Sequence, residues 1–366
     1  MRYPELRFPE LYMDGRWSLE GGPLAGLLTV VFELMRENET HSRWRHRLNQ
    51  LMRPIHQHNT ARIARRNASH HYDVGNDIYR LFLDEDWQYS CAYFVDPTMS
   101  LEDAQRAKKR HIAAKMLLDK GHKVLDIGCG WGGMALYLAN NTGAEVTGIT
   151  LADEQVRRAQ ERAGGRPDVS FRIEDYRATK GPFDRIVSVG MFEHVGVGYY
   201  DAYFGAVRRL LADDGVMLLH SIGRIGPPGH TSPFIAKHIF PGGYIPALSE
   251  LVTESEKNGW QVMDVEAMRF HYSHTLEEWY NRTVMHEAEI TEMYDEVFYR
   301  MWLFYLAGAE QSFRNGGMVN WQLQYVKDRA AIPMTREYIA EESARLREIG
   351  EIPSWRFDPA LKEAAE

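Results

Sequence analysis

The stretch Val124-Leu-Asp-Ile-Gly-Cys-Gly-Trp-Gly-Gly133 decides the fold, because it has the pattern of a buried strand, a glycine turn and the start of a helix. Glycines allow the backbone to approach a ligand closely, and the free N–H groups at the start of a helix point toward the bound molecule. Asp126, just before the first glycine, is placed to accept hydrogen bonds from the turn or from an amino group of the ligand. The stretch therefore predicts a nucleotide-binding turn.

The spacing of the glycines alone does not identify the nucleotide. Gly128, Gly130 and Gly133 also satisfy the dinucleotide-binding pattern, and Asp153 follows about twenty residues later, where that pattern places a ribose-binding acid. Nicotinamide dinucleotide and S-adenosylmethionine both remain open on this evidence. A tight turn without a ligand is disfavoured, because so many glycines gather after one apolar strand.

Length and composition indicate a globular protein with one main domain and a smaller appendage. The chain has 366 residues, of which 44% are hydrophobic and 26% charged. Its two cysteines, Cys91 and Cys129, cannot form a disulfide framework, and we find neither a secretory leader nor an apolar run long enough to span a bilayer. We therefore expect a cytoplasmic protein.

Charge is distributed unevenly along the chain. The net charge of −8 disfavours nucleic-acid binding, yet no acid occurs between Glu39 and Asp73. That interval holds many bases: Arg43, Arg45, Arg47, Arg53, Arg62, Arg65, Arg66, His41, His46, His56, His58, His70 and His71. Such a run is commonly a solvated helix surface, and the alternative is contact with an anionic membrane.

Apolar runs alternate with helical patterns through the centre of the chain. We expect strands at 123–127, 145–150, 169–173, 183–189 and 215–221, and helices at about 102–119, 131–141, 153–163 and 199–212. This alternation predicts an α/β, Rossmann-like fold with a mostly parallel sheet that is covered on both faces.

The remaining segments frame this core. Residues 1–66 are expected to form a small helical N-terminal domain that ends in the basic segment, and residues 67–366 the main domain. The Gly- and Pro-rich stretch 223–243 is expected to be a substrate lid. Residues 275–330, rich in aromatic residues and Met, are expected to be helical, and their side chains suit either an ordinary core or the lining of a site for an acyl chain. The charged tail from Thr335 is expected to form a loosely packed helix.

Several motifs occur together and in order. They are Asp126-Ile-Gly-Cys-Gly-Trp-Gly-Gly133, Gly148-Ile-Thr-Leu-Ala-Asp-Glu-Gln155, Val187-Ser-Val-Gly-Met-Phe-Glu-His-Val-Gly196, His71-Tyr-Asp-Val-Gly-Asn-Asp77, Gln88-Tyr-Ser-Cys-Ala-Tyr93, Leu218-Leu-His-Ser-Ile-Gly223 and Ile239-Phe-Pro-Gly-Gly-Tyr244. Across about residues 70–330 the chain resembles the cyclopropane fatty acid synthase family, which acts on unsaturated acyl chains with S-adenosylmethionine. The resemblance implies a class I methyltransferase fold. Glu10-Leu-Tyr-Met-Asp-Gly15 is similar to the leading domain of the bacterial phospholipid enzymes, part of which we expect to be missing upstream.

The resemblance implies which residues bind S-adenosylmethionine. Gly128 and Gly130 would pass under its methionine part, and Tyr89 and Ser90 would cover that part. The remaining predicted contacts are Asp126 at the turn, Thr150, Leu151 and Gln155 around the ribose, and Glu174 and Asp175 facing the adenine. Many methyltransferases have an acid at the end of the second strand to bind the ribose, but Thr150 stands there, so Gln155 is predicted to make that hydrogen bond.

The resemblance also implies a bound bicarbonate that acts as the base. It would be held by Cys91, Glu193, His220, Tyr272 and the backbone amide of Ile222. Methyl transfer to an alkene leaves a carbocation, which aromatic faces can stabilise in a dry pocket, and ring closure then removes a proton from the new methyl group. The spacing of Cys, His and Glu gives no close pair of metal ligands, so no metal site is expected.

These patterns predict a peripheral enzyme that adds a methylene unit to the cis double bond of a phospholipid acyl chain. Its predicted partners are unsaturated phospholipid and an anionic membrane surface, and a homodimer is left open. Three alternatives stay open as well. The same methyl transfer could end in a methyl-branched or methylene-bearing chain, the acceptor could be a soluble small molecule, or the protein could bind lipid without catalysis.

Overall fold

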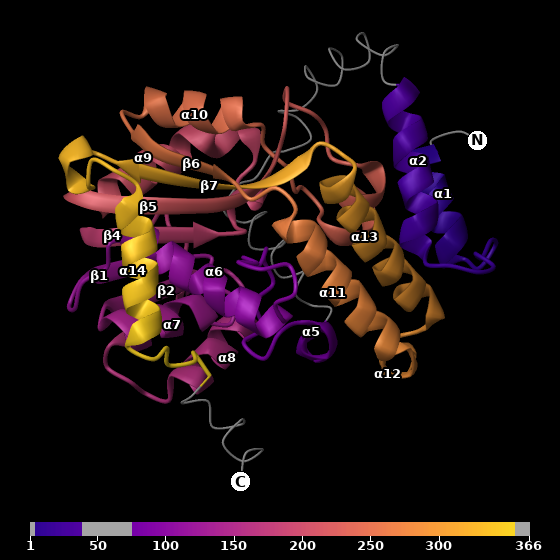
Figure 1. The fold of residues 1–366 in the computed structure, drawn as a ribbon, viewed down its shortest axis with the longest axis horizontal. Helices are drawn as coiled ribbons and strands as arrows, with labels where there is room; N and C mark the ends of the chain where they lie inside the picture. Colours follow the sequence, from indigo (N-terminus) through magenta and orange to yellow (C-terminus); the bar gives the residue numbers. More distant parts are fainter. Residues whose placement is uncertain (1–3, 39–74, 356–366) are drawn as a thin grey trace.

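The computed structural model describes residues 4–38 and 75–355, and it contains a seven-stranded sheet (Figure 1). The strand order is β3-β2-β1-β4-β5-β7-β6. The first five strands are parallel, whereas β7 runs antiparallel to both β5 and β6. The bounds are β1 Lys123–Ile127, β2 Glu145–Thr150, β3 Val169–Ile173, β4 Phe183–Val189, β5 Leu211–Arg224, β6 Gln261–Ala267 and β7 Met318–Val326.

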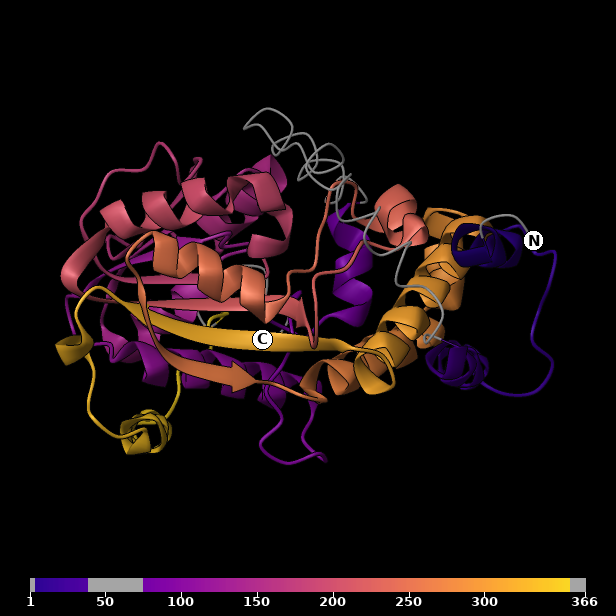
Figure 2. The same ribbon diagram turned by 90° about the horizontal axis from the view of Figure 1, so that it is seen from above.

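Helices cover both faces of the sheet, as Figures 1 and 2 show. On one face, α6 (Leu101–Met116), α7 (Gly133–Thr142) and α8 (Asp153–Ala163) share an apolar core with the strands. On the other, α9 (Tyr200–Leu210) and α10 (Leu248–Lys257) do so. Val124 belongs to the first core and Leu125 to the second, as the alternation of a strand requires. The predicted α/β fold, with a mostly parallel sheet covered on both faces, is confirmed.

A third, aromatic-rich core lies beside one end of the sheet. It is built by α5 (Asn76–Phe82), α11 (His271–Met285), α12 (Glu287–Met293) and α13 (Glu296–Arg314), and by the N-terminal helices α1 (Pro4–Met13) and α2 (Leu24–Asn38). Both N-terminal helices pack against α13, and Thr29 Oγ1 donates a hydrogen bond to Gln311 Oε1 at 2.9 Å. The predicted domain boundary after residue 66 and the basic segment lie outside the described residues, so the division into domains stays a prediction.

The prediction that residues 275–330 are entirely helical is wrong, because Met318–Val326 forms β7 in the middle of the sheet. Here Val319, Trp321, Leu323 and Tyr325 alternate with Asn320, Gln322 and Gln324, which is the period of a strand. β6 was not predicted at all, and β5 extends beyond the predicted 215–221 because it pairs with β7 as far as Arg224. The helical and aromatic part of the region therefore ends with α13.

The C-terminal tail forms a helix as predicted, α14 (Glu337–Glu348), but the expectation of loose packing is wrong. The helix packs against α6, and Leu346 is only 1% exposed. Beyond α14, Glu351 accepts a hydrogen bond from Arg110 of α6, and Ser354 is held by Lys109. The tail is thus an integral part of the face that α6 covers.

We predict that Leu346→Ala lowers the free energy of unfolding by about 2–4 kcal/mol, because it leaves a cavity between α14 and the core. Denaturant unfolding measures this. The matched control is Ile349→Ala, at an exposed position at the end of the same helix, with an expected change below about 0.5 kcal/mol. Equal effects of the two substitutions would contradict tight docking of the tail.

Candidate active site

One pocket lies at the carboxyl ends of the parallel strands, where α/β sheets bind their ligands. Every residue predicted to contact the cofactor lines it: Tyr89, Ser90, Asp126, Gly128, Gly130, Thr150, Leu151, Gln155, Glu174 and Asp175. Asp153, the acid that the dinucleotide pattern requires, is exposed on α8 and is not among the described residues that line the pocket. The geometry thus disfavours the hypothesis that the pocket binds a nicotinamide dinucleotide.

Two glycines of the turn are required for different reasons. Gly128 has φ +82°, and a Cβ there would lie 2.7 Å from Cβ of Met191, which also lines the pocket. At Gly133, a Cβ would overlap the side chains of Asp86 and Gln88. Gly128 therefore lets Met191 approach the turn closely, whereas Gly133 lets the segment before Tyr89 approach the start of α7.

Asp126 provides a buried acceptor oxygen at the pocket. The residue is 1% exposed, and its Oδ2 has no hydrogen-bond partner among the described residues. Burial raises the pKa of Asp126 to about 7, against the opposing charge of Lys108. A buried orphan acceptor is costly unless a ligand supplies a donor. The site therefore fits a ligand that carries an amino or hydroxyl group at this point, as S-adenosylmethionine does.

The ribose and adenine ends of the predicted site are already preorganised. Thr150 Oγ1 donates to Gln155 Oε1 at 2.9 Å, which orients the amide so that its Nε2 is the donor side. Arg177 holds Asp175 through Nε and Oδ1 at 2.8 Å, so the carboxylate of Asp175 is paired before any ligand binds. Pro241 and Gly242, at the end of the predicted lid, also line the pocket.

The residues predicted to hold bicarbonate are not among the described residues that line the pocket. Two of them contact each other, because the Ile222 N–H donates to Glu193 Oε1 at 2.6 Å. The other oxygen, Glu193 Oε2, is buried without a hydrogen-bond partner among the described residues. Burial raises the pKa of Glu193 to about 7, and its bond from Ile222 opposes this change.

His220 sits on β5 between two amide side chains of β7. Its Nε2 lies 3.0 Å from Asn320 Nδ2, and its Nδ1 lies 3.2 Å from Gln322 Nε2. Burial lowers the pKa of His220 to about 3, so the ring is neutral and carries a single N–H. An amide nitrogen cannot accept, so one of the two amides must turn its oxygen to the ring N–H while the other donates through its nitrogen. If His220 binds an anion, it must give up one of these two hydrogen bonds.

Cys91 and Tyr272 belong to the aromatic core. Cys91 is fully buried, its Sγ donates to the carbonyl of Ala92 at 3.3 Å, and burial raises the pKa of its thiol. The ring of Tyr272 packs edge-on against Phe313 at 4.7 Å and against Trp279 at 5.8 Å. Cys91 therefore stays a thiol, which can donate a hydrogen bond, at the border between the pocket wall and the aromatic helices.

His194 and Lys108 are among the residues at or beside the pocket that sequence reasoning did not name. His194 lines it, and burial lowers the pKa of His194 to about 4. Lys108 on α6 is fully buried, and its charge acts on Cys91, Asp126 and His220. His194 follows Glu193 in the same sequence motif, and this position could have indicated that it lies near the site. Nothing in the very polar sequence of α6 indicated that Lys108 is buried.

The sequence is similar to proteins of known family. The family model for mycolic acid cyclopropane synthetase matches residues 58–323. The chain is 39% identical over 316 residues to the cyclopropane-fatty-acyl-phospholipid synthase of Escherichia coli strain K12, and the match covers 86% of this chain and 81% of that protein. The chain belongs to the cyclopropane synthase family. It is therefore a homologue of S-adenosylmethionine-dependent methyltransferases, as its motifs predicted.

Other relatives in this family are similar over most of the chain. A tuberculostearic acid methyltransferase of Mycobacterium tuberculosis is 34% identical over 346 residues, covering 89% of this chain and 80% of that protein. The solved cyclopropane synthase MmaA2 from Mycobacterium tuberculosis superposes with a TM-score of 0.69 at 32% identity, over 71% of this chain and 97% of that one. Mycolic acid cyclopropane synthase CmaA1, complexed with SAH and CTAB, gives 0.68 at 33% identity with the same coverage.

We predict that Glu193→Gln stabilises the fold at pH 8 and changes little at pH 4. A carboxyl whose pKa is raised on folding contributes stability below its unfolded pKa of about 4.5 and loses it as the pH rises through about 7. Glutamine avoids that loss and keeps an oxygen for the Ile222 N–H. Chemical denaturation at both pH values should show a gain on the order of 1–3 kcal/mol at pH 8 only. Exposed Glu256→Gln is the control, and a gain of Glu193→Gln that does not depend on pH would refute the argument.

Proposed function

We propose that this protein transfers a methylene group from S-adenosylmethionine to the cis double bond of unsaturated phospholipid acyl chains, which forms a cyclopropane ring. The observation that carries the proposal is the position of Tyr89. It lines the cofactor pocket, its ring lies 5.2 Å from that of Trp279 on α11, and its hydroxyl lies 3.2 Å from that of Tyr305 on α13. The predicted methyl-donor site and the aromatic helices, which are suited to an apolar chain, thus share one wall.

The proposed reaction assigns different roles to the cofactor and to the aromatic residues. When bound, S-adenosylmethionine supplies an electrophilic methyl group on its sulfonium. The rings of Tyr272, Phe313 and Trp279 pack together, and this cluster would offer π faces to a cationic acyl chain and exclude the water that would capture it. Tyr89, whose pKa burial keeps well above its usual value, remains a neutral phenol at this wall.

Ring closure needs a base, and the proposed one is bicarbonate. Cys91, Glu193, His220, Tyr272 and the Ile222 amide would hold this ion, and it would accept the proton from the transferred methyl carbon. To bind the ion, the Ile222 N–H would exchange its bond to Glu193 for one to the ion. Glu193, whose Oε2 has no partner among the described residues and whose pKa is raised, would orient the ion through a hydrogen bond.

A second product is supported by one comparison. Without ring closure, the carbocation could lose a proton from a neighbouring chain carbon, which gives a methyl-branched alkene. Alternatively, a hydride shift from the methyl-bearing carbon followed by loss of a proton from the transferred carbon would give a methylene-bearing chain. The 34% identity to a tuberculostearic acid methyltransferase favours this candidate over unrelated activities.

We predict that purified protein moves label from the methyl group of S-adenosylmethionine into vesicles of cis-unsaturated phospholipid, and that the product shows high-field cyclopropane protons by NMR. Vesicles of saturated phospholipid are the control and should stay unlabelled. In the same assay Glu193→Gln should lower turnover strongly while cofactor affinity, measured by calorimetry, is retained.

Other results would be equally clear. Methyl-branched or methylene signals in the lipid would select the second product. Label found only in a soluble acceptor, or lipid bound without any transfer, would overturn the lipid-modifying assignment. An active Glu193→Gln variant would count against the bicarbonate site.

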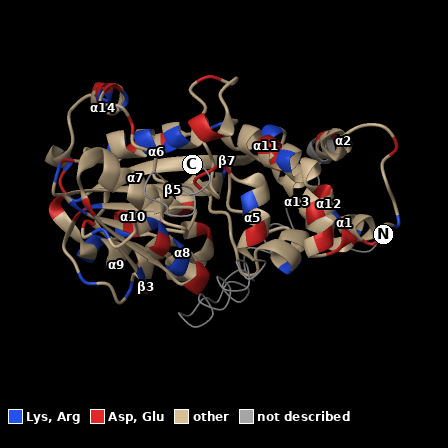
Figure 3. Cartoon of the chain, turned by 90° about the horizontal axis from the view of Figure 1, so that it is seen from below, with Lys and Arg blue, Asp and Glu red and all other residues tan. Residues whose placement is uncertain are grey.

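We further propose that the protein is cytoplasmic and binds the membrane peripherally through the acid-free basic segment. No helix in the described ranges 4–38 and 75–355 is long and apolar enough to cross a membrane. In the cartoon of Figure 3, the positions of basic and acidic residues are interspersed along the described helices. The basic segment itself lies outside these ranges, and it is the part of the sequence whose charge complements an anionic lipid surface.

We predict that replacing Arg62, Arg65 and Arg66 together by Gln weakens binding to anionic vesicles at low salt, because each Arg near such a surface contributes roughly 1 kcal/mol within a Debye length of about 8 Å. Co-sedimentation across a salt series measures this, and cofactor affinity should not change. The control replaces three cations of the described helices by Gln, which alters the net charge equally: Arg157, Lys257 and Arg345. Binding that is insensitive to salt and to the first triple substitution would mean that these arginines pair within the fold.

A further inference from the structure

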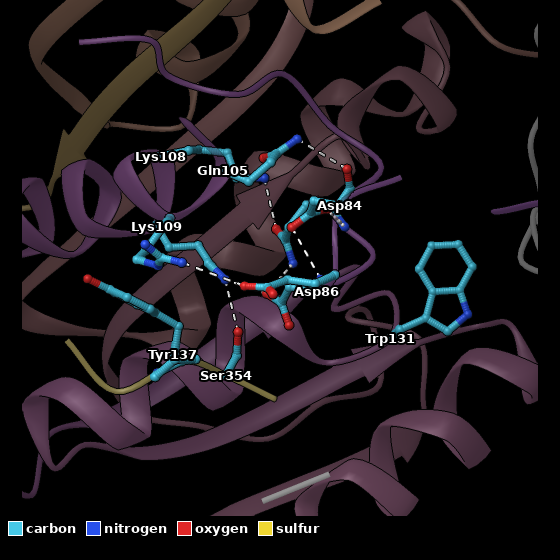
Figure 4. A network of polar contacts seen from close by, with 12 residues as sticks. Asp84, Asp86, Gln105, Lys108, Lys109, Trp131, Tyr137 and Ser354 are labelled. Carbon is cyan, nitrogen blue, oxygen red and sulfur yellow. Dashed lines mark hydrogen bonds and ion pairs between the residues drawn. The ribbon is translucent and has the colours of Figure 1, made fainter. Parts of the chain in front are cut away.

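Helix α6 holds the segment that covers the pocket through two buried side chains, one turn apart. Gln105 Nε2 donates to the carbonyls of Gln88 and Ser90 at 3.2 and 2.9 Å. Lys108 Nζ donates to Gln88 Oε1 and to Ser90 Oγ, both at 2.8 Å. Gln105 and Lys108 are both fully buried, and Figure 4 shows them projecting from α6 into a network that includes Asp84 and Asp86.

The contact from Lys108 determines which way Ser90 can donate. An ammonium group has three donors and no acceptor, so the Ser90 oxygen accepts and its own hydrogen must point elsewhere. Gln88 is oriented in the same way, because its Oε1 accepts from Lys108 while its Nε2 donates to Asp86 Oδ2 at 3.2 Å. Ser90 lines the cofactor pocket, so its hydroxyl is a donor to an acceptor group of the ligand.

The carboxylates near Lys108 favour its ammonium form, which donates to Ser90. Burial and the charge of Lys109 lower the pKa of Lys108, whereas Asp84 and Asp86 raise it, and the net result is a pKa of about 7. Lys108 in turn opposes the rise of the Asp126 pKa on the far side of the turn. A ligand carboxylate beyond Ser90 would add negative charge on the pocket side and would stabilise the ammonium form.

We propose that Lys108 is a positioning residue that fixes Ser90 as a hydrogen-bond donor to the carboxylate of the cofactor's amino-acid part. This role rests on the proposed function only because it assumes the same cofactor. It goes beyond the proposed function because it concerns a residue that lies behind the pocket wall. Lys108 acts through Ser90 and does not itself touch the ligand. Its removal should therefore affect only ligands that carry the carboxylate.

The test compares two ligands by calorimetry. S-adenosylhomocysteine carries the amino-acid part, whereas 5′-methylthioadenosine has the adenine, the ribose and the sulfur but no carboxylate. Lys108→Met should weaken binding of S-adenosylhomocysteine about tenfold or more, the size expected for a charge-assisted hydrogen bond, and leave methylthioadenosine within about twofold. Ser90→Ala should show the same selectivity, and the double variant should lose little beyond Ser90→Ala alone.

A control separates this role from general support of the fold. Lys115→Met removes another fully buried lysine of α6, whose ion pairs are with Asp264 and Glu266 of β6, and it should not discriminate between the ligands. Equal loss of both ligands in Lys108→Met, or additive losses in the double variant, would overturn the proposal. If Lys108→Met does not fold, Ser90→Ala still decides, because the absence of a selective loss there refutes the proposal. Wild-type protein that binds neither ligand would instead contradict the proposed cofactor.

Discussion

The buried cations of α6 are the constraint on which the rest of this structure depends. Lys108, Lys109, Arg110 and Lys115 are all at most 7% exposed on one helix. A buried charge is tolerated only when it is paired, and removing one partner of such a pair typically costs about 3–5 kcal/mol. The ion-pair partners of Lys109, Arg110 and Lys115 come from distant parts of the chain: Asp86 before the pocket, Asp264 and Glu266 on β6, and Glu351 after α14. Lys108 donates to Gln88 and Ser90. Helix α6 thereby joins the pocket wall, the edge of the sheet and the C-terminal tail.

The pocket inherits its shape from these pairs. Asp86 is bound by Lys109 and also by Arg162 of α8, so the segment that leads to Tyr89 is held from two helices. Gly133 allows the same segment to lie against the start of α7. The end of this segment contacts both the pocket and the aromatic helices. Tyr89 lines the pocket and packs on Trp279, and the Ala92 N–H donates to Thr275 Oγ1 of α11. The pocket and the aromatic core are therefore coupled through a few residues of extended chain.

The elements that sequence reasoning placed well are those with local signals. The bounds of β1 to β4 agree with the predicted ranges, because short apolar runs between turns are typical of buried parallel strands. β7 was missed although its polar and apolar residues alternate, because Asn320, Gln322 and Gln324 are buried polar residues in the middle of a sheet. Their burial depends on partners such as His220 and Lys115, which only the folded chain supplies. The tail was read as loosely packed for the same reason, since Glu351 and Ser354 find their partners on α6.

The sequence by itself determined the fold class, the family and the residues gathered around the glycine turn, because parallel strands bring their carboxyl ends to one edge and the motifs follow those ends. Only the tertiary structure decided how the side chains are engaged. It joined Glu193 to the Ile222 amide, enclosed His220 between two amides of β7 and buried Lys108 behind Ser90. These contacts span up to about a hundred residues, and their energies depend on burial and on the direction of donors. No local pattern in the chain encodes either of these properties.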